Sequence, residues 1–68
     1  MTLGEIIRNE GLTIKMLYEY LISRGIEITL SSLHRYCRAS SHSFGRYDVW
    51  EAIDAFVIEN DIPWDDEW

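Results

Sequence analysis

Residues 21–36, LISRGIEITLSSLHRY, contain the end of one predicted helix, a turn and most of the next predicted helix. Gly25 ends the first helix, because glycine adopts the left-handed conformation that follows a helix without a steric penalty. Thr29 begins the second, since a threonine there can accept a hydrogen bond from a free amide of the first turn. The stretch therefore predicts helices over residues 14–24 and 30–39, joined by a tight connection.

The same signals predict a short helix before this pair. Thr2 followed by Glu5 is the pattern of a capping box, in which each residue satisfies a free amide of the other. Gly11 ends that helix as Gly25 ends the next one. Thr13 then caps the helix over residues 14–24.

A fourth helix is predicted over residues 49–59. Asp48 followed by Glu51 is a second, acidic capping signal, and Pro63 prevents the helix from continuing far beyond Asn60. No strand and no internal repeat are recognised. The fold class is therefore all-α: a compact four-helix domain over residues 1–60, followed by an acidic C-terminal tail over 61–68.

Apolar residues recur at helical spacing and define the expected core. Tyr18 and Tyr47 are counted with the core aromatics, and the isoleucines of the connection are expected to pack inward. The predicted core comprises Leu3, Ile6, Ile7, Ile14, Leu17, Tyr18, Leu21, Ile22, Ile26, Ile28, Leu30, Leu33, Tyr36, Cys37, Tyr47, Val49, Trp50, Ile53, Phe56 and Val57.

The 68 residues suffice for one domain, and a chain this short buries only ~60% of the surface that it exposes when unfolded. Cys37 is the single cysteine, so no internal disulfide can form. Added stability is expected from aromatic packing or from a homodimer, which we favour. A lone thiol, no apolar run of about 20 residues and no signal peptide predict a cytoplasmic protein.

Charge is distributed unevenly along the chain. The net charge is −6, yet all six basic residues lie in residues 1–47 with only four acids, and residues 48–68 carry eight acids and no base. Residues 28–47 contain three arginines, two histidines and no acid. A locally basic segment in an anionic chain argues against indiscriminate nucleic-acid binding but allows a specific interface.

The predicted third helix has a polar stripe opposite its apolar one. Ser31, His34, Arg35 and Arg38 follow each other at helical spacing and are expected on one exposed face. Arginine can donate two hydrogen bonds to guanine O6 and N7, and serine and histidine can reach base edges or phosphates. This helix is therefore the candidate reader of the DNA major groove, with Lys15 of the preceding helix on the phosphate backbone.

The polar loop after this helix extends the candidate interface. Ser41, His42 and Arg46 are short donors or a cation, suited to a closely approaching phosphate strand. A plain polar connector between two helices is the alternative interpretation.

Residues 21–36 resemble the helix-turn-helix of small phage and mobile-element regulators. The run has a leucine, a glycine turn, alternating apolar residues, a threonine cap and an Arg-Tyr pair. It is similar to Cro-like repressors and to Mu-like phage DNA-binding proteins over about residues 13–38. The resemblance implies a repressor-type transcription regulator whose base contacts map to Ser31, His34, Arg35 and Arg38, acting on double-stranded DNA.

Other functions are considered beside this one. His34, Cys37 and His42 do not supply the four ligands of a structural zinc site, so neither a metal nor another cofactor is expected. Nothing suggests a catalytic cleft, and the protein is not predicted to be an enzyme. The main alternative is an acidic protein-binding module of the same fold, an inhibitor or adaptor that acts on a host protein through the Trp-containing tail. Two alternative interpretations of the tail are a solvated chain end and an acidic segment that repels DNA from one side and so orients the protein on it.

Overall fold

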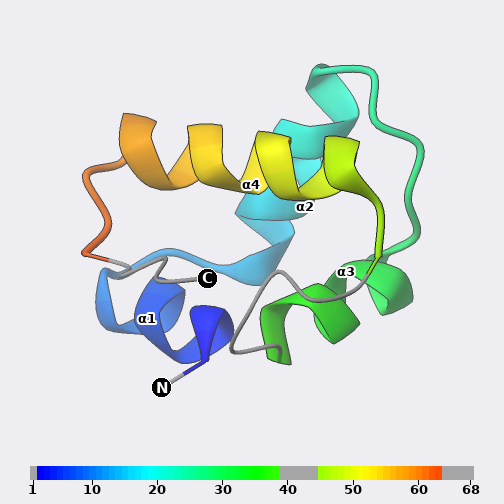
Figure 1. Ribbon diagram of the computed structural model, residues 1–68. Coiled ribbons are helices and arrows are strands. Elements are labelled where there is room, and N and C mark those ends of the chain that lie inside the picture. The colour runs from blue at the N-terminus through cyan, green and yellow to red at the C-terminus, as the bar shows by residue number, and fades with distance from the viewer. Residues whose placement is uncertain (1, 39–44, 64–68) are drawn as a thin grey trace.

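The computed structural model contains four helices and describes residues 2–38 and 45–63 (Figure 1). The helices are α1, Leu3–Asn9; α2, Ile14–Ser23; α3, Leu30–Arg38; and α4, Tyr47–Glu59. The described residues include no strand. The prediction of an all-helical four-helix domain is therefore confirmed.

The helix starts of α1, α2 and α3 are set by threonines, as predicted. Thr2 and Glu5 form the capping box, because each accepts a hydrogen bond from the backbone amide of the other. Thr13 Oγ1 accepts from the amide of Met16 at 3.2 Å, and Thr29 Oγ1 accepts from the amide of Ser32 at 3.1 Å. These bonds satisfy amides that have no partner within their own helix.

Glycines end the first two helices. Gly11 has φ +78° and Gly25 has φ +83°, the left-handed conformation that glycine adopts most readily. After α2, the Ile26 amide donates to the carbonyl of Leu21 at 3.0 Å, which closes the helix end. The chain then turns through residues 24–29 into α3.

The predicted start of α4 is wrong. The helix begins at Tyr47, with Arg46 at the N-cap position and no side-chain cap. Asp48 therefore lies in the first turn, where its carboxylate is bound by the guanidinium of Arg46 and also accepts from the amide of Val49. Asp48 stabilises the helix start by this ion pair rather than by a capping box.

The helices form two sides of one core. Figure 1 shows α4 on one side and α1 and α3 together on the other, with α2 crossing between them. The α1–α3, α2–α3 and α2–α4 pairs make the main contacts between helices. The outer surfaces of α3 and α4 therefore lie on different sides of the molecule.

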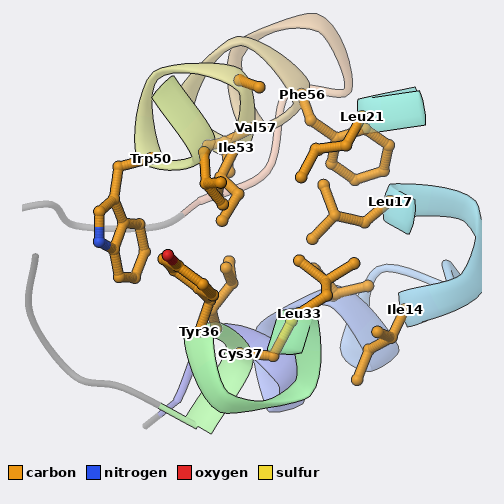
Figure 2. Close-up of a cluster of buried hydrophobic side chains, with 14 of the residues drawn as sticks. Ile14, Leu17, Leu21, Leu33, Tyr36, Cys37, Trp50, Ile53, Phe56 and Val57 are labelled. Carbon is orange, nitrogen blue, oxygen red and sulfur yellow. The ribbon is translucent and has the colours of Figure 1, made fainter. Parts of the chain in front are cut away.

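Side chains from α2, α3 and α4 meet in the interior (Figure 2). Tyr36 packs edge-to-face on Trp50, with ring centroids 5.1 Å apart. Ile62, predicted to lie in the tail, also belongs to this core. The buried apolar residues are Leu3, Ile6, Ile7, Ile14, Leu17, Leu21, Leu33, Tyr36, Cys37, Val49, Trp50, Ala52, Ile53, Phe56, Val57 and Ile62.

Three residues predicted for the core are exposed instead: Ile22 is 45%, Leu30 41% and Tyr47 80% exposed. At about 100° per residue, Ile22 lies roughly a quarter-turn beyond the stripe of Leu17 and Leu21. Tyr18, Ile26 and Ile28 are partly buried and pack against the core. None of the helices in residues 2–38 and 45–63 is long and apolar enough to span a membrane.

Candidate nucleic-acid interface

α3 presents a polar stripe to solvent. Its inner face consists of Leu33, Tyr36 and Cys37, which are at most 6% exposed. Ser31, Arg35 and Arg38 lie on the opposite face and are all exposed. Their spacing places them within ~60° of one another around the helix axis. We call Ser31, Arg35 and Arg38 the outer stripe of α3.

His34 lies at the border of this stripe. It is half-buried, because it falls between the outer stripe and the buried side of the helix. The structure thus brings Ser31, Arg35 and Arg38 together as predicted, and it places His34 at their flank.

The two arginines of the stripe have no acid on their own helix, and both lie in its last turn. Within residues 2–38 and 45–63, no carboxylate forms an ion pair with Arg35 or Arg38. Their charges therefore face solvent, where they are available to an anionic partner.

α3 is held in position by the helix before it and by the cap at its start. Leu17 and Leu21 of α2 are fully buried and lie close to Leu33 of α3 in the core (Figure 2). Thr29 is further bound by its hydroxyl to Ser32, with Oγ1 and Oγ 3.0 Å apart. These contacts fix which side of α3 faces solvent and so fix the direction of the outer stripe.

Lys15 lies in the first turn of α2 and is exposed. Figure 1 shows that α2 begins on the side of α1 and α3 and ends beside α4. Lys15 is therefore at the α3 end of the crossing helix. The cation at the C-terminal end of α2 is Arg24. Unlike Lys15, it has a described partner, because it donates to the hydroxyl of Tyr20 at 3.1 Å and lies over the ring of that tyrosine.

Arg46 has a structural position that the sequence did not reveal. Its guanidinium pairs with both carboxylate oxygens of Asp48 and also donates to the backbone carbonyl of Glu27. The hydrogen bond to Asp48 raises the pKa of Arg46, and the same bond lowers the pKa of Asp48. Arg46 thus ties the start of α4 to the α2–α3 turn, which leaves it fewer donors for a phosphate.

The remaining predicted contacts, Ser41 and His42, lie outside the described residues, as does the acidic segment 64–68.

A hollow of about 670 Å³ opens beside the outer stripe. Its wall includes the apolar side chains of Ile22 and Ile28, the aromatic residue Tyr36, and the polar residues Ser32, Arg35 and Arg46. The exposure of Ile22, which the sequence pattern assigned to the core, is explained by its place in this wall. Arg35 therefore belongs both to the stripe and to the hollow.

The exposed side of α4 was missed by sequence reasoning. Tyr47 and Ile58 are 80% and 77% exposed, although both are large and apolar. The predicted helix began at residue 49 and so did not include Tyr47. With the helix begun at residue 47, helical spacing places Tyr47 and Ile58 on the same face.

No family model, no curated protein and no solved structure matches this chain.

Proposed function

We propose that the protein is a sequence-specific double-stranded DNA-binding protein that inserts α3 into the major groove. The observation that carries the proposal is the outer stripe of α3, with two exposed arginines and no paired acid within the described residues. An α-helix fits the width of the major groove, and arginine recognises guanine there through two hydrogen bonds. The stripe combines that geometry with that chemistry.

Each residue of the stripe has a distinct role in this proposal. Arg35 and Arg38, about one helical turn apart, contact the O6 and N7 atoms of guanines. Ser31, near the start of α3, donates to a base edge or a phosphate, and His34 at the flank does the same. Those of these contacts that reach base edges supply specificity.

The supporting helix supplies orientation. In a helix-turn-helix arrangement, the first helix of the pair crosses the phosphate backbone while the second enters the groove. Here α2 and α3 take those roles, and Lys15 in the first turn of α2 neutralises a phosphate. Such contacts set the register of the protein on DNA without reading its sequence.

The biological role that follows is a cytoplasmic transcription regulator, a repressor of phage or mobile-element type that acts by occupying its site. A homodimer would place two copies of α3 one DNA turn apart, ~34 Å, and would read a palindrome. Because the molecule carries a net charge of −6, affinity depends on the local stripe rather than on overall attraction to DNA.

The test is selection of binding sites from random duplex DNA, followed by affinity measurements on the selected site. Arg35→Ala and Arg38→Ala should each weaken binding by about 1–3 kcal/mol and relax the base preference at one position. Arg24→Ala is the matched control, because Arg24 is equally an exposed arginine but lies at the end of α2 that is beside α4. Failure to enrich any sequence, or equal losses in all three variants, would overturn the proposal.

A further inference from the structure

The outer face of α4 has an apolar residue at each end. Tyr47 and Ile58 are the two most exposed large apolar residues of the described chain, at 80% and 77%. They lie eleven residues apart, which returns to the same side of a helix after three turns. Their Cα atoms are thus separated by ~16 Å along the helix axis. The buried residues Val49, Ile53 and Phe56 occupy the opposite side.

Between these apolar ends the face is acidic. α4 contains four acids and no base, and Glu51 lies in line with Tyr47 and Ile58. Glu51 is exposed and forms no ion pair within the residues that the structure describes. Two of the other acids are already engaged: Asp48 pairs with Arg46, and Glu59 accepts from the hydroxyl of Tyr20. We call Tyr47, Glu51 and Ile58 the outer stripe of α4.

A second copy of the chain is a poor occupant of this stripe. If two α4 helices packed antiparallel, Tyr47 would meet Ile58 of the second copy, but Glu51 would face its Asp54. A parallel arrangement would set Glu51 against Glu51. Both arrangements bring acidic faces together, since neither α4 contributes a base between its apolar ends. A cationic partner avoids this cost.

We propose that the outer stripe of α4 binds a basic amphipathic helix of another protein. Apolar side chains of the partner, spaced by three helical turns, would cover Tyr47 and Ile58, and a lysine or arginine between them would pair with Glu51. Apolar anchors supply most of the binding energy in such contacts, while charge complementarity speeds association and selects the partner.

This surface lies on a different helix from the proposed DNA interface, and the two come close at one end, where Arg35 and Arg46 line the same hollow. α4 and α3 lie on different sides of the core in Figure 1. The proposal does not depend on the DNA-binding function, and either can fail alone.

The probe is a synthetic helical peptide with two leucines at the spacing of Tyr47 and Ile58 and lysines between them on the same face. A control peptide has the same composition with its leucines moved to the opposite face. Binding to the full chain is followed by fluorescence anisotropy. The first peptide should bind more tightly than its control, and Tyr47→Ser with Ile58→Ser should weaken it about tenfold. Both substitutions are on the surface, and helicity by circular dichroism checks the fold.

Glu51→Lys is tested against Glu10→Lys, which changes the net charge equally but lies after α1. Glu51→Lys should weaken binding severalfold more than Glu10→Lys. Equal binding of both peptides, or equal effects of the two lysine variants, would show general charge attraction and overturn the proposal. A dimer in sedimentation equilibrium that dissociates on Ile58→Ser would also overturn it, in favour of a second copy.

Discussion

Cys37 shows how closely the side chains are packed at the level of single residues. It is 2% exposed, and a Cβ on Gly4 of α1 would lie 3.4 Å from its carbonyl oxygen. A methyl group at Gly4 would therefore make ordinary van der Waals contact with α3. The sequence predicted a buried thiol at position 37 correctly, because Cys37 falls in register with Leu33 on one helical face.

Burial has a measurable consequence for Cys37. It raises the pKa of the thiol from 9.0 to about 11, because the thiolate would lose its hydration. Between these values the unfolded chain loses the proton while the folded chain keeps it, so the folded state binds more protons. The free energy of unfolding should therefore fall as the pH rises from 9.0 to about 11.

Urea unfolding over this pH range tests the prediction, with Cys37→Ala as the comparison. Tyr20, whose pKa is raised by its hydrogen bond to Glu59, titrates in both proteins and so cancels. The alanine variant should show the shallower decline in stability. Identical pH dependence in the two proteins would mean that the thiol is not shielded from water in the folded state.

At the scale of the helices, the ends that are set by local sequence signals were the most predictable part of the fold. Threonine caps and glycine ends act over three or four residues, so they can be recognised in the sequence alone. The start of α4 could not be found in this way. It is stabilised by Arg46 bonded to the carbonyl of Glu27, nineteen residues earlier, and such a contact exists only after folding.

The exposed positions of Ile22 and Leu30 have a similar explanation. Helical spacing places both residues next to the apolar stripe of their helix. It does not show whether a neighbouring helix extends far enough to cover them. Ile22 lines the hollow beside α3, and Leu30 is the first residue of its helix. Whether a residue at the edge of a stripe is covered depends on tertiary packing, which the local pattern does not contain.

The junction of α3 with α4 gives a test at the scale of these elements. Gly45 has φ +82°, and a Cβ there would lie 2.5 Å from the hydroxyl of Tyr36. That hydroxyl accepts a hydrogen bond from the Arg46 amide at 2.8 Å. Gly45→Ala should therefore lose stability both through backbone strain and through displacement of Tyr36.

Gly25→Ala is the matched control for this prediction. Gly25 has nearly the same φ, +83°, but nothing lies within 4 Å of the position of its added Cβ. It should lose only the cost of left-handed backbone, about 1 kcal/mol. Gly45→Ala should lose about 1–3 kcal/mol more by chemical denaturation, as expected for overpacking. Equal losses would show that Tyr36 moves aside freely.

At the scale of the whole molecule, the uneven charge of the sequence becomes a difference between two sides. The helix α3, which contains no acid, and the acidic α4 lie on different sides of the core in Figure 1. The outer stripe of α3 could be predicted, since it depends on helical periodicity within one element. The stripe of α4 could not, because its first residue precedes the predicted helix.

The structural role of Arg46 also appears only at this scale. Composition groups it with Arg35 and Arg38 as a cation of the acid-free run. In the folded chain Asp48 and the carbonyl of Glu27 engage Arg46, whereas Arg35 and Arg38 are exposed.

The central claim, that α3 is the surface that contacts DNA, is tested most directly by NMR. Amide chemical shifts of the ¹⁵N-labelled protein would be followed while a selected duplex is added. We predict changes at Ser31, Arg35 and Arg38 and at Lys15, with the amides of Glu51 and Ile58 unaffected. Changes confined to α4, or no change anywhere at saturating DNA, would contradict the account.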